Sequence, residues 1–453
     1  MSPLPRDLGH GLRLRHATEA DAERLAVFYG DILRPQDAAE PSTSMAVWTR
    51  DLISGRHPSF RAGDALLVED ARGEVVSSAL LFSHTWSFGG VPIAVGQPEL
   101  VGTRAEFRGR GLVRTLFEEL HRMSAARGHQ LLAINGIPFF YRQFGYEMAL
   151  ELGGGPTMHL TGLASFLKQS PLSYRVRPAR PPDVTFIAAT DARGAQRYLV
   201  TVSRDEALWR YELDGRSPGN GARREWLIVE TPHGEPVAIL EHIWELWGPA
   251  LHVRRLEVAP GVSWRDVGVA VLGYLLDTGH EYARRDGREF GMIGFWFLGS
   301  AHPIREVFRF TTTDRPYAYY LRVPDLPDFL RRVAPVLERR LAASPLAGHT
   351  ADLRLSFYRD GVRLVIDAGR LKSVEAWPVA RDPVGLDFAL PSNDPRRPSA
   401  MLPGLTFLQL LFGYRSLEEL ETAFPDCTVR GSENRALLNA LFPKEPSLVW
   451  PVL

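Results

Sequence analysis

The stretch from Glu99 to Leu112 constrains the fold of this chain most, because it joins a short apolar segment to a basic glycine turn. Leu100 to Thr103 predicts a strand, since it includes residues that favour extended backbone. The turn Arg-Gly-Arg-Gly follows at 108–111, and apolar residues then recur at helical spacing to about Arg127. A glycine turn that leads into a helix points free N–H groups and the positive end of the helix dipole at one place. This order predicts a phosphate or pyrophosphate site, although a lone turn of this kind is equally compatible with a solvated surface turn.

A second motif, Phe-Phe-Tyr-Arg-Gln-Phe-Gly-Tyr-Glu, occupies Phe139–Glu147. In this order and spacing the two segments resemble the GCN5-related N-acetyltransferase (GNAT) superfamily. The acyl-CoA loop of that superfamily reads Q/R-x-x-G-x-G/A, and its domain closes with Phe-Tyr-x-x-x-Gly-Phe/Tyr. Glu106 stands where the loop pattern has Gln or Arg. The predicted order of the first part of the chain, a strand, two helices, three strands, the glycine loop, a helix and a strand, is the one that this resemblance implies.

The resemblance implies a cleft for acetyl-CoA as co-substrate and no metal. The backbone of Val101 and Thr103 would contact the pantetheine arm, and Asn135 would mark the splayed strand opposite. Tyr141 is the implied general acid, because its hydroxyl can protonate the leaving thiolate; the alternative is that Tyr141 merely packs in the core. The implied acyl-CoA ligands are Val101, Gly102, Thr103, Arg108, Gly109, Arg110, Gly111, Leu112 and Asn135.

Length and composition limit the classes of protein that fit. The chain has 453 residues, which predicts roughly two to four domains. Its formal net charge is zero, so no overall field favours nucleic acid or an anionic membrane. A single cysteine, Cys427, excludes a disulfide within the chain and a cysteine-based metal site. The absence of a long apolar run predicts no membrane span and no signal peptide, so we expect a cytoplasmic protein.

The remaining sequence predicts two further units. Leu251–Val258 contains alternating apolar residues, Ser263 is placed to cap a following helix, and Phe295–Leu298 predicts another strand. This order resembles a second, degenerate GNAT domain, which lacks the Arg-Gly-x-Gly turn and a tyrosine like Tyr141. The last unit combines amphipathic helices with alternating segments around Asp360-Gly361, a hairpin signal, and resembles a sterol-carrier-protein-2-like domain.

Taken together, the three units resemble the enhanced-intracellular-survival (Eis) acetyltransferase family. The predicted fold class is α+β, with a catalytic GNAT domain at 1–160, a degenerate GNAT-like domain at 170–325 and a sterol-carrier-protein-2-like domain at 326–453. The resemblance implies a homo-oligomer that acetylates a primary amine, on a small molecule or on lysine, by direct attack on the thioester. The alternative is a lipid- or partner-binding protein on a non-catalytic GNAT scaffold.

The group that accepts the proton of the amine stays open at this point. The resemblance implies that the C-terminal carboxylate of Leu453 enters the active site as base or orienting group. The apolar, proline-containing tail is equally compatible with packing on the third domain. Glu99, His84 and water are the rival proton acceptors, and a structural role explains Glu99 and His84 better than catalysis does.

Overall fold

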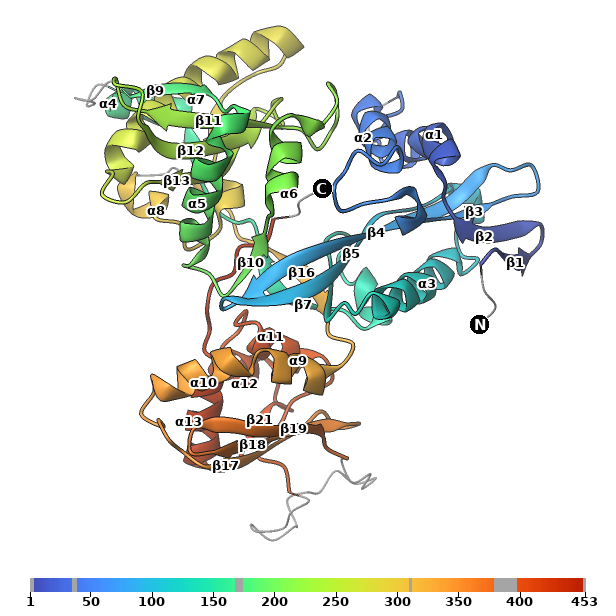
Figure 1. Cartoon of the computed structure of the whole chain (residues 1–453), viewed down its shortest axis with the longest axis vertical. Helices are drawn as coiled ribbons and strands as arrows, with labels where there is room; N and C mark the ends of the chain where they lie inside the picture. Colours follow the sequence, from blue (N-terminus) through green and yellow to red (C-terminus); the bar gives the residue numbers. More distant parts are fainter. Residues whose placement is uncertain (1–3, 35–38, 168–173, 309–311, 379–396, 451–453) are drawn as a thin grey trace.

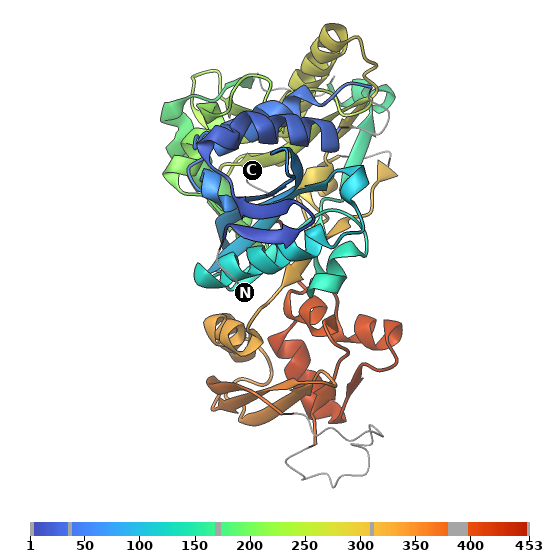
Figure 2. The ribbon, with the colours of Figure 1, turned by 90° about the vertical axis from the view of Figure 1, so that its right-hand side faces the viewer.

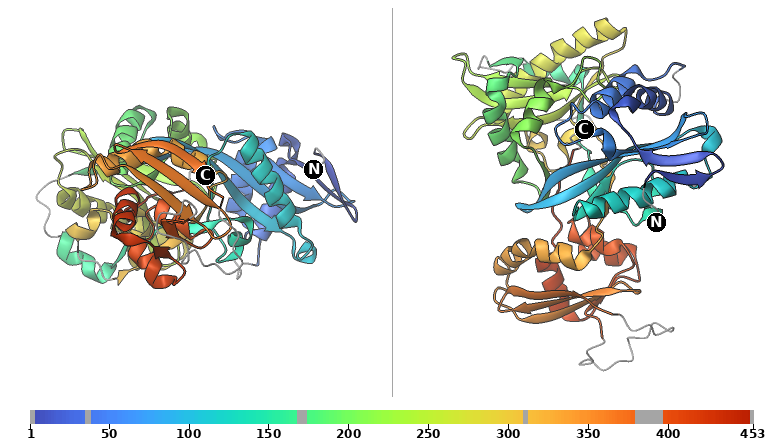
Figure 3. Two further views of the ribbon diagram at one scale, coloured as in Figure 1. Left: turned by 90° about the horizontal axis from the view of Figure 1, so that it is seen from below. Right: turned by 45° about the vertical axis from the view of Figure 1, so that its right-hand side comes forward.

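The computed structural model describes residues 4–34, 39–167, 174–308, 312–378 and 397–450. These residues form a mixed α+β fold with three β-sheets, one in each of three lobes (Figure 1). The first two lobes lie side by side and the third lies below them, as the turned views also show (Figure 2, Figure 3). Across the described ranges, no helix is long and apolar enough to cross a membrane.

The first lobe contains a nine-stranded sheet in the order β1-β2-β3-β4-β5-β6-β16-β7, with β10 paired to β4. Alternate residues of β4 face opposite sides, so α3 packs on one face while α1 and α2 pack on the other. The strands are β1 (Arg6–Gly9), β2 (Leu12–His16), β3 (Ala65–Glu69), β4 (Val75–Phe88), β5 (Val91–Thr103), β6 (Leu131–Ile134), β7 (Glu147–Leu152), β10 (Val200–Ser203) and β16 (Tyr317–Arg322). The helices are α1 (Ala22–Ile32), α2 (Thr43–Ile53) and α3 (Leu112–Ala126).

The second lobe contains a seven-stranded sheet in the order β15-β8-β14-β13-β12-β11-β9. Ser263 caps α7 as the sequence predicts, and its Oγ accepts a hydrogen bond from Asp266 N at 3.3 Å. The predicted strand at Phe295–Leu298 is wrong, because β14 ends at Gly294 and Trp296–Leu298 forms a 3-10 helix. The strands are β8 (Pro156–His159), β9 (Arg175–Pro178), β11 (Arg224–Glu230), β12 (Pro236–Ile243), β13 (Ala250–Val258), β14 (Met292–Gly294) and β15 (Thr312–Thr313). The helices are α4 (Leu160–Leu167), α5 (Val184–Ala195), α6 (Glu206–Arg210), α7 (Trp264–Asp286) and α8 (Ile304–Val307).

The third lobe contains a five-stranded sheet in the order β19-β18-β17-β20-β21. The predicted hairpin around Asp360-Gly361 joins β17 to β18, which pair antiparallel. The strands are β17 (Ala351–Ser356), β18 (Gly361–Asp367), β19 (Arg370–Ala376), β20 (Ala400–Met401) and β21 (Thr428–Val429). The helices are α9 (Leu326–Arg332), α10 (Ala334–Ala342), α11 (Thr406–Leu411), α12 (Leu417–Ala423) and α13 (Gly431–Leu441).

The first two lobes exchange strands. β8 follows β7 along the chain but pairs with β14 and β15 of the second sheet. β16 follows the second sheet but lies between β6 and β7 of the first. Separating these lobes would therefore break backbone hydrogen bonds as well as side-chain contacts. The predicted domain limits stay predictions, and the exchange means that each sheet takes strands from both sides of the break at 160–170.

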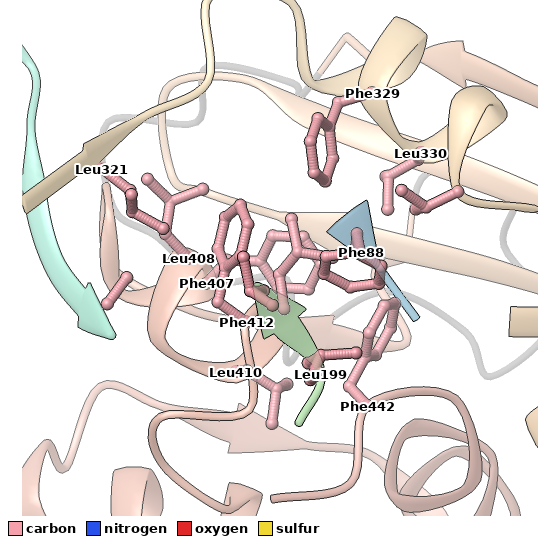
Figure 4. Packing of buried hydrophobic residues seen from close by; sticks show 14 of the residues in the cluster. Phe88, Leu199, Leu321, Phe329, Leu330, Phe407, Leu408, Leu410, Phe412 and Phe442 are labelled. Carbon is pink, nitrogen blue, oxygen red and sulfur yellow. The ribbon is translucent and has the colours of Figure 1, made fainter. Parts of the chain in front are cut away.

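The first and third lobes share one apolar core (Figure 4). Phe88, at the end of β4, packs edge-on against Phe329 of α9 and Phe412 after α11, with ring centroids 5.9 and 5.8 Å apart. Leu199, next to β10, joins the same cluster. Burial of a side chain such as Phe88 contributes about 2 kcal/mol, so these contacts hold the third lobe against the first.

Candidate active site

A cleft opens in the first sheet between β5 and β6. The two parallel strands pair at Val95–Leu131 and Gly96–Leu132, after which β6 pairs with β16 on its other side. A cavity of about 650 Å³ lies beside the later half of β5 and runs to the start of α3. Its lining includes seven of the predicted acyl-CoA ligands and the predicted acid, namely Val101, Gly102, Thr103, Arg108, Gly109, Gly111, Leu112 and Tyr141.

The glycine turn at 108–111 lines the end of this cavity that lies next to α3. Gly109 and Gly111 have φ values of 75° and 78°, in the left-handed region that favours glycine. A Cβ added at either would meet no atom within 4 Å, because both glycines face open space. Gly111 is the N-cap of α3, so the first N–H groups of a fifteen-residue helix point toward this end of the cavity. The geometry suits an anion such as a pyrophosphate.

Two predicted ligands lie away from the cavity lining. The guanidinium of Arg110 donates from Nη2 to Glu106 O at 3.2 Å and lies 4.9 Å from the centroid of the Phe107 ring. Asn135 follows β6 directly, on the strand that borders the cleft. Both assignments stay predictions.

Tyr141 is held by a tightly shaped segment. It belongs to a 3-10 helix over Phe140–Phe144, which follows Phe139 at φ 67° and ends at Gly145 at φ 83°. The Tyr141 side chain is buried, and its ring lies 5.5 Å from that of Tyr320 on β16. Burial and the nearby charge of Glu99 raise the pKa of Tyr141 well above its usual value. Its hydroxyl therefore stays protonated at neutral pH and can act as a proton donor.

Glu99 lies on β5 next to a strained residue. The φ of Leu100 is 48°, at a shift in the β4–β5 register. Oε1 of Glu99 accepts a hydrogen bond from Nε2 of Gln97 at 2.9 Å. Desolvation by the surrounding protein raises the pKa of Glu99 to about 7. The hydrogen bonds from Gln97 and from the backbone of Leu100 lower this pKa, but by less. The carboxyl can therefore exchange a proton near neutral pH.

No sequence motif indicates a role in the site for Tyr319 and Tyr320, which β16 brings to the same region. Burial raises the pKa of both Tyr141 and Tyr319, and the negative charge of Glu99 raises both further, so these three groups lie near one another. The Tyr319 hydroxyl is fully buried and has no hydrogen-bond partner in the part of the chain that the structure describes. Strand exchange thus completes a site whose other residues come from the N-terminal part of the chain.

Two histidines lie farther along the face of the sheet on which Glu99 lies. His84 stacks on Phe82 at 5.7 Å between centroids, and burial lowers the pKa of His84 to about 3. His57 packs edge-on against Phe82 and Tyr211, and burial lowers its pKa to about 4. Both imidazoles are therefore neutral at pH 7, and each is a much weaker base than Glu99.

The second lobe adds a buried group of arginines. Arg216 pairs with Glu212 through two hydrogen bonds of 2.9 and 3.0 Å. Arg224 and Arg254 share one carboxylate, with their Nε atoms 3.4 and 3.5 Å from Oε1 of Glu241. Burial and the neighbouring guanidiniums lower the pKa of Arg224 to about 10 and that of Arg254 well below its usual value. The region has more positive than negative charge and favours an additional anion.

The C-terminal tail runs along β10 toward these arginines. Leu199 N donates to Pro446 O at 2.8 Å, and Leu448 N donates to Val200 O at 2.9 Å. The ring of Trp450 lies 4.3 Å from the guanidinium of Arg254 and 4.2 Å from the centroid of Phe297. Trp450 thus contacts the second lobe, whereas the alternative from the sequence was packing on the third. Leu453 lies outside the described residues, so its predicted role stays a prediction.

Comparisons with known proteins agree with this geometry. Residues 13–149 match the family model described as an acetyltransferase (GNAT) domain. Similar solved structures include a probable N-acyltransferase from Enterococcus faecalis V583, with 13% identity, a TM-score of 0.63 and coverage of 97% of this chain and 99% of that chain. A GCN5-related N-acetyltransferase from Kribbella flavida has 17% identity, a TM-score of 0.63 and 99% coverage of both chains. Eis1 from Mycobacterium abscessus has 15% identity, a TM-score of 0.55 and coverage of 98% of this chain and 99% of that chain.

These findings define the fold of the chain and the class of its N-terminal domain. No curated protein sequence matches the chain significantly. At these identities the solved structures show a shared fold, and this fold extends over nearly the whole chain. Residues 13–149 are a GNAT acetyltransferase domain by the match to the family model.

Proposed function

We propose that this protein transfers the acetyl group of acetyl-CoA to a primary amine, by direct attack of the amine on the thioester. The observation that carries the proposal is the cleft between β5 and β6, where Gly109, Gly111 and Tyr141 line one cavity. The acceptor would be a small molecule or a lysine side chain. The second lobe would be a degenerate GNAT-like domain and the third a sterol-carrier-protein-2-like domain, in a cytoplasmic homo-oligomer.

The residues of the cleft, together with Glu99 on the same strand β5, can perform each step of the proposed reaction. The N–H groups at the start of α3 hold the pyrophosphate, and the open edge of β5 holds the pantetheine arm. Glu99 accepts a proton from the incoming ammonium, directly or through water. The neutral amine nitrogen then bonds to the thioester carbon and the carbon–sulfur bond breaks. The leaving thiolate takes the proton of the Tyr141 hydroxyl. The acetylated nitrogen then releases its second proton, which returns to the Tyr141 phenolate directly or through water, so the amide and the thiol are both neutral products. No acetyl group is bonded to the protein at any stage.

The test of this proposal is thiol release from acetyl-CoA in the presence of a panel of amines, with coenzyme A binding measured by calorimetry. We expect micromolar to millimolar KM values for acetyl-CoA, as is usual for enzymes. Failure to bind coenzyme A would exclude the proposal.

The proposed role of Glu99 predicts the pH dependence of the reaction. Because the carboxylate must be deprotonated to accept a proton, kcat/KM should rise with pH and level off above a pKa of about 7. Glu99→Gln should remove this limb and lower kcat/KM by roughly 10²-fold. His84→Gln is the matched control and should leave the limb in place, because the pKa of His84 is too low to produce it. An unchanged profile in Glu99→Gln would refute this assignment.

We also propose that the carboxylate of Leu453 reaches the active-site region, where the surplus of arginines would stabilise it. The direction of the tail up to Trp450 supports this proposal. A short Gly-Ser extension after Leu453 should then lower turnover at least tenfold, because it moves the carboxylate away and adds volume. The same extension at the N-terminus should have no effect. Wild-type turnover in the C-terminally extended protein would exclude a role for the carboxylate.

A cavity of about 710 Å³ in the third lobe supports the second candidate function, lipid binding. Phe357, Val362 and Phe407 contribute apolar walls. The charged lining residues are Arg331, Arg359, Asp325, Asp360 and Glu375. Such a site would suit an apolar lipid chain, with charged groups of both signs near its head group. Stoichiometric lipid in mass spectra of the purified protein, with no binding of coenzyme A, would favour this function over acetyl transfer.

A further inference from the structure

A separate cavity of about 750 Å³ lies where the three lobes meet. Its walls come from α5 and β10, from the β4–β5 turn at Gly89 and Gly90, and from α10 of the third lobe. None of its lining residues belongs to the acyl-CoA cleft. Cavities of this size hold drug-sized ligands in other proteins.

The charged groups that line this cavity are unbalanced. They comprise four arginines and two carboxylates, namely Arg197, Arg204, Arg339, Arg340, Asp191 and Glu445. Asp191 also forms an ion pair with Arg255, which lies outside the cavity; Nε of Arg255 is 3.1 Å from Oδ1 of Asp191. The interaction of Arg204 with Asp191 is correspondingly long, at 3.4 Å from Nη1 to Oδ2. Arg197 pairs with Glu257 outside the cavity, so the positive charge that the carboxylates of the cavity do not neutralise comes from the other three arginines.

Arg204 is the most constrained of these cations. Its side chain is 4% exposed, and its guanidinium lies 4.9 Å from the centroid of the Trp209 ring. Its Nε has no hydrogen-bond partner among the described residues. A buried guanidinium is costly unless charged or polar groups surround it, so an anion in the cavity would improve its environment.

Part of the remaining wall is apolar. Ala188, Ala192 and Ala195 of α5 line one side, Val336 of α10 lines another, and Trp209 contributes an aromatic surface. A purely inorganic ion would leave these surfaces uncovered. An organic anion with a flat or apolar body would contact both the arginines and the apolar wall.

We propose that this cavity is a binding site for a small organic anion, a carboxylate or phosphate ester with an apolar or aromatic body. Because the walls come from all three lobes, the ligand stabilises their arrangement. Leu199 of the same wall also holds the tail, through the hydrogen bond from its N–H to Pro446 O. Binding of the anion in this cavity is thus linked to the position of the C-terminal tail. The proposed binding site does not depend on the proposed transferase activity.

The fluorescent aromatic anion 8-anilinonaphthalene-1-sulfonate is a suitable probe. It is titrated into the full-length protein with saturating coenzyme A, which occupies the acyl-CoA cleft. Ala192 and Arg339 are exposed residues that line the cavity. Ala192→Trp adds a large side chain that fills the cavity, and Arg339→Glu reverses the charge of one lining residue. Arg331→Glu is the matched control, because Arg331 is an exposed arginine on the neighbouring helix that lines the other cavity of the third lobe.

We expect one saturable site whose dissociation constant rises at least tenfold in Ala192→Trp and in Arg339→Glu and stays unchanged in Arg331→Glu. Phenyl phosphate or benzoate should displace the probe, and the stronger competitor identifies the preferred anionic group. Failure of both competitors, or absence of saturable binding, would overturn the proposal. Loss of binding in Arg331→Glu alone would overturn it as well, because it would locate the probe in the third-lobe cavity.

Discussion

Replacing Tyr141 with phenylalanine should lower kcat about 10²- to 10³-fold and leave the dissociation constant of coenzyme A within about twofold. The loss in kcat is the usual contribution of a positioned general acid. The binding constant should hold because the substitution keeps the ring that packs against Tyr320 and removes one oxygen atom. Thiol release at saturating acetyl-CoA gives kcat, and calorimetry gives the dissociation constant.

Tyr146→Phe is the control for this variant. Tyr146 is equally buried and lies in the same aromatic cluster, but its hydroxyl is 3.0 Å from His121 Nε2, and it does not line the cavity. Its loss should cost about 1 kcal/mol of the free energy of unfolding and change kcat by less than about threefold. Equal losses of kcat in the two variants would mean that the cluster supports the cleft and that Tyr141 is not the acid.

The parts of the site that could be predicted from the sequence are those set by local chemistry. The glycines of the turn at 108–111 and the apolar spacing after Leu112 determine a loop and a helix without help from distant residues. The short segment around Tyr141 likewise lies where two positive φ values bracket a 3-10 helix. The resemblance to GNAT enzymes depends on these two segments, and the family model covers the same part of the chain.

The parts that could not be predicted depend on contacts between residues far apart in sequence. Tyr317–Arg322 forms β16, and no local pattern in the sequence reveals which sheet this strand joins. Its position between β6 and β7 brings Tyr319 and Tyr320 beside residues near position 140. The buried arginine group has the same origin, because Arg216, Arg224 and Arg254 are scattered along the second lobe without a motif.

Phe295–Leu298 shows a different limit. Four consecutive apolar residues predict a strand, yet their burial comes from ring packing rather than from strand pairing. Trp296 and Phe297 lie with centroids 4.9 Å apart and nearly perpendicular, and Phe297 also packs on Trp450. Short apolar runs are ambiguous between a strand and a buried turn of helix, because periodicity cannot separate them.

Replacing Gly111 with valine should weaken coenzyme A binding at least 100-fold, or about 2.7 kcal/mol. The φ of Gly111 is 78°, so a branched side chain there is strained by about 1–3 kcal/mol. Its Cβ would also project into the open space in front of the first N–H groups of α3, where the pyrophosphate is proposed to lie. Calorimetry with coenzyme A measures the affinity, and thermal unfolding measures the strain.

Gly128→Val separates these two effects. Gly128 follows the other end of α3, has a φ of 68°, and likewise has no atom within 4 Å of an added Cβ. Both variants should therefore lower Tm by several degrees, since each introduces comparable backbone strain. Coenzyme A affinity should fall in Gly111→Val alone, because only that glycine lines the cleft. If Gly128→Val weakens coenzyme A binding as much, the effect is one of helix stability and the start of α3 does not hold the pyrophosphate.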